Sequence, residues 1–187
     1  MKRWLIPQML VFALLLLTAL WCDPSFDRRQ LRVMPANLRV VLLRMVAVLL
    51  AGGAALLFTT IFWSQLQVRV FAFAFEHPVL WLAILLLYPV TSAAAQELIF
   101  RVFVFHRYRT LFPSNWAVIL ASAGSFALAH LQLGNFVAPV LSFVGGLRFA
   151  YTYVATRSLP IVSLEHGLWG DWIFTIGLGA YFYGGYL

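Results

Sequence analysis

Cysteine is almost missing from this sequence, because Cys22 is the only one in 187 residues. A single cysteine excludes an intramolecular disulfide, a redox pair of the Cys-x-x-Cys type and any metal site built from several thiolates. Charge is also scarce, since Asp, Glu, Lys and Arg together make up 10% of the chain. Soluble domains carry about 25% charged residues, so the composition argues against an ordinary water-soluble domain.

Apolar residues take the place of the missing charges. They make up 63% of the chain, and the mean hydropathy is +0.90, which indicates an integral membrane protein surrounded by a lipid bilayer. The net charge of +7 comes from thirteen basic residues that are scattered or lie at the ends of apolar runs. No basic face interleaved with aromatics is present, so we expect no nucleic-acid partner. We expect the chain in a bacterial inner (cytoplasmic) membrane.

Long apolar runs predict an all-α fold, a polytopic transmembrane helical bundle with about six membrane-spanning segments. The first run shows no small-x-small cleavage pattern, so we expect it to remain as a span. The first five predicted segments are Trp4–Trp21, Leu38–Trp63, Val79–Tyr108, Trp116–Leu133 and Phe136–Thr156. The sixth starts after Pro160 and runs to about Tyr183.

Two stretches each fit more than one structure. Ser64–Pro78 is rich in Phe and partly alternating, which fits either an interfacial amphipathic segment or a tail of the second helix. Val79–Tyr108 is too long for one upright helix, and we expect Pro89 to kink or split it. We divide the chain into an N-terminal transmembrane hairpin with its interfacial segment, residues 1–78, and a transmembrane core, residues 79–187.

Basic residues are distributed unequally between the predicted loops. The opposite side of the membrane carries only Lys2, Arg3 and Arg69. The positive-inside rule then predicts cytoplasmic first, third and fifth loops and external termini, provided that Val79–Tyr108 crosses once. Those three loops and their flanks carry Arg28, Arg29, Arg32, Arg39, Arg107, Arg109 and Arg157.

Glu97 and Arg101 are two charges inside the long apolar third segment. An ionisable side chain near the bilayer centre costs about 2.5–3.5 kcal/mol on insertion scales, so it normally faces protein or a water-filled cavity. The spacing of four residues puts both groups on one helix face, with the acid on the N-terminal side, the better order for an ion pair. The pair either holds helices together or belongs to a functional site.

Polar clusters recur on the successive segments of the core. Arg148 needs a carboxylate partner, for which Glu97, Glu165 and Asp171 are the candidates. An isolated intramembrane histidine often makes only an interhelical hydrogen bond, but one cluster on each helix predicts a shared cavity. The clusters are QELIFR with Gln96, Glu97 and Arg101; FALAH with Phe126 and His130; Arg148; and LEHGLWGD with Glu165, His166, Gly170 and Asp171.

At these residues the sequence resembles the CPBP family of intramembrane peptidases, which groups CAAX-type prenyl-protein proteases with bacteriocin-processing and immunity proteins. The family has three motifs on successive helices: EExxxR, FxxxH, and a histidine followed four residues later by Asn or a similar polar residue. They match Gln96–Arg101, Phe126–His130 and His166 with Gly170. The resemblance covers roughly Val79 to Tyr183 and implies a peptidase-like core.

Two motif positions differ from the family pattern. Gln96 stands where the family has its first glutamate, to which activation of water is assigned. Gly170 stands where the family has a polar residue that helps a histidine bind the oxyanion. Asp171 lies one residue further on, about 100° away around a helix, and is an imperfect substitute.

Peptide hydrolysis in a membrane needs a group that deprotonates water, donors for the tetrahedral oxyanion, and a cavity that admits water and a peptide. We expect Glu97 to serve as the base, His130 to orient the water and His166 to donate to the oxyanion. A second mechanism uses metal, because Glu97, His130 and His166 form the His₂Glu set of catalytic zinc sites, although HExxH is absent. The first mechanism needs no cofactor, and the second needs a divalent metal such as zinc.

Three functions stay open at this point. The first is an intramembrane endopeptidase that cleaves a membrane-associated protein or peptide by water that a glutamate and histidines activate. The second is a catalytically impaired family member that binds a membrane peptide or partner protein, which the changes at Gln96 and Gly170 favour. The third is a small transporter or channel, although inverted repeats and paired broken helices are missing. The sequence does not indicate an oligomeric state.

Overall fold

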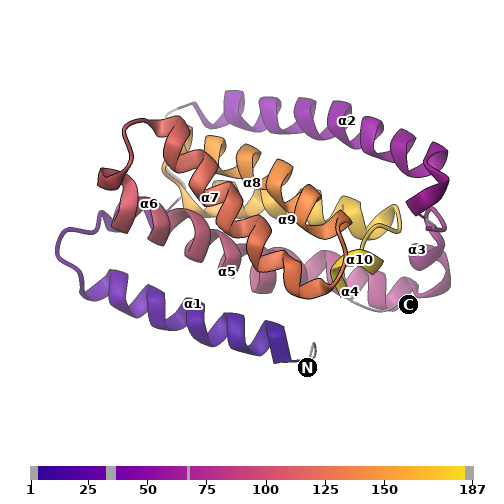
Figure 1. Ribbon diagram of the computed structural model, residues 1–187, viewed down its shortest axis with the longest axis horizontal. Helices are drawn as coiled ribbons and strands as arrows, with labels where there is room; N and C mark the ends of the chain where they lie inside the picture. The colour runs from indigo at the N-terminus through magenta and orange to yellow at the C-terminus, as the bar shows by residue number, and fades with distance from the viewer. Residues whose placement is uncertain (1–3, 33–36, 67, 184–187) are drawn as a thin grey trace.

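The computed structural model describes residues 4–32, 37–66 and 68–183, and within these ranges the chain is helical with no strand (Figure 1). The fold is therefore the predicted all-α bundle. The helices that correspond to predicted segments are α1 (Leu5–Cys22), α2 (Leu38–Phe62), the long third helix described below, α7 (Asn115–His130), α8 (Val137–Thr156) and α9 (Leu159–Thr175).

The third segment is one continuous helix that runs from Pro78 to Leu111. It consists of α4 (Pro78–Tyr88), α5 (Ala94–Glu97) and α6 (Val104–Tyr108), joined by π-helical turns over 89–93 and 98–103 and closed by a 3₁₀ turn. The expected split at Pro89 does not occur. The widened turn accommodates the proline, and the Ala94 amide closes that turn by donating to the Pro89 carbonyl.

Five described helices are long and apolar enough to cross a membrane. They are α1, α2, the 78–111 helix, the helix that extends α7 to Leu133, and α8, and they make the chain an integral membrane protein. α9 has 17 residues and ends at Thr175, well before the predicted end at Tyr183. Gly177 turns the chain there with φ 93°, and a short helix, α10 (Ala180–Tyr183), follows.

The stretch between α2 and the third helix is not a tail of α2. That helix ends at Phe62, and a 3₁₀ turn follows over 64–66. After Gln67, which lies outside the described residues, Phe71 takes a left-handed conformation and the short α3 (Ala72–Glu76) begins. Arg69 and Glu76 form an ion pair across this segment.

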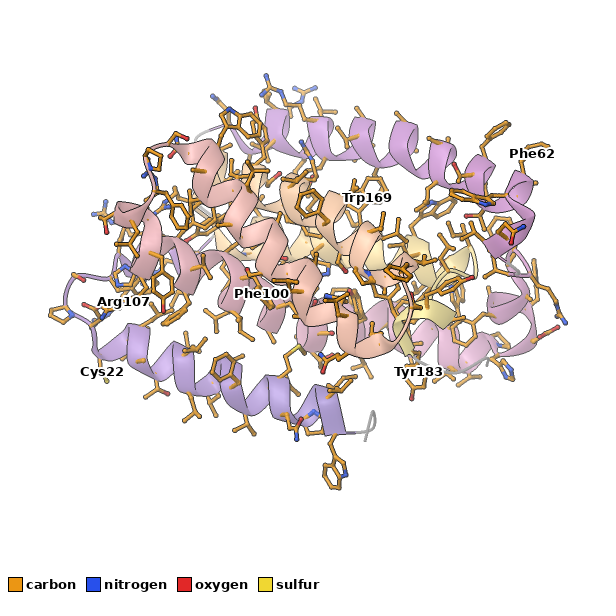
Figure 2. All side chains as sticks on the ribbon, in the orientation of Figure 1. Cys22, Phe62, Phe100, Arg107, Trp169 and Tyr183 are labelled. Carbon is orange, nitrogen blue, oxygen red and sulfur yellow. The ribbon has the colours of Figure 1, made fainter. Side chains whose placement is uncertain are left out.

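The loops that follow α1, α6 and α8 lie at one end of the bundle (Figure 1). The His106 ring lies 2.8 Å from the Asp23 carboxylate, and the Ser158 hydroxyl donates to the Arg32 carbonyl at 2.7 Å. The hydrogen bond from His106 holds the pKa of the Asp23 carboxyl well below its usual range. Figure 2 shows Arg107 at this same end.

This arrangement groups the arginine-rich loops as the sequence predicts. Arg69 lies in the connection at the opposite end, whereas Lys2 and Arg3 lie outside the described residues (Figure 1). The third segment also crosses the bundle once, which the orientation argument requires. The cytoplasmic location of the arginine-rich end stays a prediction.

α2 packs on α9 through two glycines. A Cβ on Gly52 would come 2.7 Å from the Trp169 ring, and one on Gly53 would come 3.1 Å from the Trp172 ring nitrogen. That nitrogen donates to the Gly53 carbonyl at 3.1 Å. Figure 2 shows Trp169 on the side of the core that faces α2. α1 and α2 therefore flank a core that the 78–111 helix, α7, α8 and α9 build.

Candidate active site

Glu97 and Arg101 form an ion pair at the centre of the core. Glu97 Oε2 and Arg101 Nε lie 3.1 Å apart, and both side chains are fully buried. Arg101 Nη2 also donates to the Gly146 carbonyl on α8 at 3.2 Å, and its guanidinium lies over the Phe126 ring of α7 at 4.5 Å. Arg101 thus connects the third helix to α7 and α8. The pairing is the one that the spacing of four residues predicts.

We expect Arg101→Leu to lower the stability of the protein strongly, because it leaves the Glu97 carboxylate buried without its cation. Breaking one partner of a buried pair costs about 3–5 kcal/mol. Thermal unfolding in detergent should show a much lower midpoint for Arg101→Leu than for the native protein. The matched control is Arg107→Leu, six residues further along the same helix and exposed. Similar midpoints for both variants would contradict a structural role of the pair.

His166 lies between Glu97 and a tyrosine. Its Nδ1 is 2.7 Å from Glu97 Oε1, and its Nε2 is 3.0 Å from the Tyr88 hydroxyl. The ring stacks on Phe149 with centroids 4.6 Å apart and an interplanar angle of 17°. An ionised carboxylate only accepts hydrogen bonds, so Nδ1 carries the proton and Nε2 accepts from Tyr88 when the ring is neutral. Glu97 therefore fixes both the tautomer and the orientation of His166.

His130 is the last residue of α7 and also contacts the Phe126 ring. Its Nδ1 lies 2.8 Å from the Phe126 carbonyl oxygen, which can only accept, so Nδ1 carries the proton here as well. Nε2 then has a free lone pair in the neutral ring. The Phe126 ring centroid is 4.7 Å from that of His130 and 5.5 Å from that of His166, so this ring contacts both imidazoles edge to face.

A cavity of about 830 Å³ opens beside these groups, with walls from α1, α2, the third helix, α7, α8 and α9. It is mostly apolar. Glu97 does not line it, because it lies behind His166 and is fully buried. The polar side chains that line it from the core include Tyr88, Ser92, Gln96, His130, Ser142, Arg148 and His166.

Gln96 lines the cavity, whereas its neighbour Glu97 does not. Its Nε2 donates to the Ser92 hydroxyl at 2.8 Å, and its Oε1 is buried without a hydrogen-bond partner among the described residues. Adjacent helical residues point about 100° apart, and here Gln96 faces the cavity while Glu97 faces His166 and Arg101. The carboxamide can accept a hydrogen bond from water or from a peptide amide, but it cannot take a proton.

Arg148 finds its partner in Glu165, one of the three carboxylates considered. Arg148 Nε lies 2.7 Å from Glu165 Oε1, and Glu165 is 2% exposed. The pair connects α8 with α9, and Arg148 lines the cavity. Asp171 does not line the cavity, and its Oδ1 is buried without a hydrogen bond among the described residues.

The predicted site residues are therefore partly brought together. Glu97, Arg101 and His166 are in direct contact, and Gln96, His130, Arg148 and His166 share the cavity wall. Sequence reasoning did not identify Tyr88 as a site residue. Tyrosine is common where transmembrane helices meet the membrane interface, so its presence there does not indicate function. The only available signal was Gly170 at a position where the family pattern has a side chain.

Glu97, His130 and His166 do not fit a metal site in this arrangement. Both nitrogens of His166 are within hydrogen-bond distance of protein groups, and both oxygens of Glu97 face His166 or Arg101. Only His130 has a ring nitrogen left for a ligand bond. Within residues 4–32, 37–66 and 68–183, no group of three or more His, Cys, Asp or Glu side chains is arranged to hold a metal ion.

Comparison with known proteins agrees with the motifs. Residues 78–170 match the family model described as type II CAAX prenyl endopeptidase Rce1-like. Searches of curated proteins and of solved structures find no match. The matched region begins at the first residue of α4 and ends within α9, so it includes Gln96, Glu97, Arg101, His130 and His166. The chain thus belongs to the CAAX-protease-like CPBP family of intramembrane peptidases.

Proposed function

We propose that the protein is an intramembrane endopeptidase that hydrolyses a peptide bond of a membrane-associated protein or peptide. The observation that supports this most strongly is the pair of histidines with fixed tautomers at the wall of one cavity. His130 and His166 both line it, and each has its Nδ1 proton committed to a protein acceptor. His130 therefore presents a basic Nε2 to the cavity, whereas His166 Nε2 accepts from the Tyr88 hydroxyl.

In this mechanism His130 is the general base. Its Nε2 takes a proton from water as the water oxygen bonds to the scissile carbonyl carbon, and the carbonyl oxygen becomes an oxyanion. The same proton then passes to the leaving nitrogen as the carbon–nitrogen bond breaks. Gln96 Oε1 accepts a hydrogen bond from the attacking water. The geometry favours His130 over Glu97 as the base, because Glu97 does not line the cavity.

Glu97 instead acts as a positioning residue. Its carboxylate accepts from His166 Nδ1 and pairs with Arg101, so its negative charge is held by two partners. A buried carboxylate that orients an imidazole keeps the correct tautomer and stabilises positive charge on the ring. Because the side chains of Glu97 and Arg101 are fully buried, these interactions act away from bulk water and are stronger than they would be at the surface.

Gln96 is the observation that favours the alternative function. A carboxamide stands at the cavity wall where the family pattern has a carboxylate, so a family member that binds a membrane peptide without cleaving it fits the same geometry. The cavity volume of about 830 Å³ would hold the peptide in either case. The two functions differ in what happens to the bound peptide.

The test is a cleavage screen with purified protein in liposomes. The substrates are a farnesylated peptide ending in a CAAX sequence and a set of unmodified transmembrane peptides, with products identified by mass spectrometry. We expect cleavage that persists in the presence of a chelator, and we expect Gln96→Glu to raise kcat, because it adds a second base at the wall. Ser92→Ala is the control for the lost hydrogen bond to Gln96. Capture of a peptide without cleavage by either protein would favour the binding function, and loss of activity with the chelator would favour a metal.

A further inference from the structure

Gly170 and Tyr88 are complementary in shape. A Cβ built on Gly170 would lie 2.1 Å from Tyr88 Cε1 and 2.8 Å from the Tyr88 hydroxyl oxygen. Contacts this short cannot exist, so Tyr88 occupies the space that any side chain at position 170 would need. Gly170 itself has no side chain to offer the cavity.

The residues next to Gly170 and Tyr88 also allow α9 and the third helix to lie close together. Gly167, one turn before Gly170 on α9, faces Pro89, where an added Cβ would lie 2.7 Å from the proline Cβ. Pro89 begins the π turn, which lies between Tyr88 and Gln96. In a regular α-helix, two residues eight positions apart, such as Tyr88 and Gln96, point about 80° apart around the helix axis. The wider π turn between them reduces this angle. Tyr88, Ser92 and Gln96 consequently line one cavity.

The hydroxyl of Tyr88 lies where His166 would otherwise meet a substrate. His166 Nδ1 is committed to Glu97, and Nε2 lies 3.0 Å from the Tyr88 oxygen. His166 therefore has no N–H free to donate to a substrate in the neutral state. Tyr88 lines the cavity and carries an O–H donor.

We propose that Tyr88 is a catalytic residue whose hydroxyl donates the hydrogen bond that stabilises the oxyanion, with His166 and Glu97 holding that hydroxyl in place. The inference rests on the proposed peptidase function. As the scissile carbonyl oxygen gains negative charge, it becomes a stronger acceptor than neutral His166 Nε2, and the Tyr88 O–H turns to it. No proton leaves Tyr88. The proton from water goes to His130 and then to the leaving nitrogen, so the step is balanced.

A structural role is the competing explanation, because the Tyr88 ring also packs against Phe174 with centroids 5.6 Å apart. Tyr88→Phe keeps the ring and removes only the hydroxyl. If the hydroxyl binds the oxyanion, kcat should fall by about 10²–10³ while KM and the thermal midpoint stay near the native values. Tyr151→Phe, an exposed tyrosine on α8, is the matched control and should retain native activity.

A second variant tests whether position 170 can take over the role. In Tyr88→Ala/Gly170→Asn the ring is gone, and the new amide has room to donate from α9. We expect this double variant to recover at least tenfold in kcat over Tyr88→Ala/Gly170→Ala, which has the same space but no donor. All variants are compared by thermal unfolding in the same liposome or detergent preparation.

The outcomes separate this inference from the proposed function. A native protein that cleaves, with Tyr88→Phe within about threefold of it in kcat, overturns the role of Tyr88 and leaves the peptidase function standing. If Tyr88→Phe lowers both kcat and the thermal midpoint, and the Gly170→Asn double variant recovers no kcat, this role is also overturned. Tyr88 then contributes to packing and not to oxyanion binding. A native protein that cleaves no peptide overturns both proposals.

Discussion

His130→Ala should lower kcat for peptide cleavage by about 10²–10⁴, the usual contribution of a general base. The expected cause is loss of the His130 Nε2 atom at the cavity wall, which has no hydrogen-bond partner among the described residues, whereas Nδ1 is bonded to the Phe126 carbonyl. His130 is half-buried at the end of α7, so removing its ring should change the thermal midpoint little. His77→Ala, at an exposed histidine outside the cavity, should keep native activity.

The pH dependence gives this prediction a second readout. A base works only when it is unprotonated, so native kcat should fall as the pH falls and His130 gains a proton. The residual activity of His130→Ala should lose this dependence. If the variant keeps both the rate and the acidic limb of the native profile, another group is the base.

Glu97→Gln should have an effect of comparable size through a different route. The neutral amide can donate to His166 as well as accept from it, so it no longer fixes the tautomer that leaves Nε2 as an acceptor. The equivalent change beneath a catalytic histidine in a serine protease lowers kcat by about 10⁴. His166 here holds the oxyanion donor and is not the base, so we expect a smaller loss, about 10²–10³ in kcat in the liposome assay, with Glu76→Gln as an exposed control.

Stability and catalysis can be separated for Glu97. The substitution also leaves Arg101 buried without its anion, which should cost about 3–5 kcal/mol. Glu97→Gln/Arg101→Met removes both charges and should recover most of that stability without recovering kcat. Recovery of kcat in the double variant would mean that Glu97 acts only as a structural partner. If Glu97→Gln abolishes cleavage while His130→Ala keeps native activity, Glu97 is the base.

Much of the bundle could be predicted from the apolar runs, because length and hydropathy alone determine which helices can cross a bilayer. The Glu97 and Arg101 pair follows from spacing on one helix. The continuity of the helix through Pro89 could not be predicted, since it depends on a π turn packed against Gly167 of α9. The early end of α9 likewise depends on the turn at Gly177, where an added Cβ would meet the Arg69 carbonyl at 3.0 Å.

The site was predicted in its composition but not in its arrangement. Glu97 and Gln96 are neighbours in sequence, and the motif does not tell which of them faces the cavity. The sequence offered three carboxylates as partners of Arg148, and the packing of α8 on α9 selects Glu165. Tyr88 carried no signal of its own, because its role follows from the space left by a glycine on another helix.

The most direct test of the account is cleavage of a membrane peptide in ¹⁸O-labelled water. Purified native protein in liposomes is incubated with the substrate that the screen identifies, and the products are analysed by mass spectrometry. We predict a product whose new carboxyl group carries one ¹⁸O atom, formed at a rate that falls by at least 10² in His130→Ala. A native protein that binds the peptide and forms no labelled product, or a His130→Ala variant that forms it at the native rate, would contradict the account.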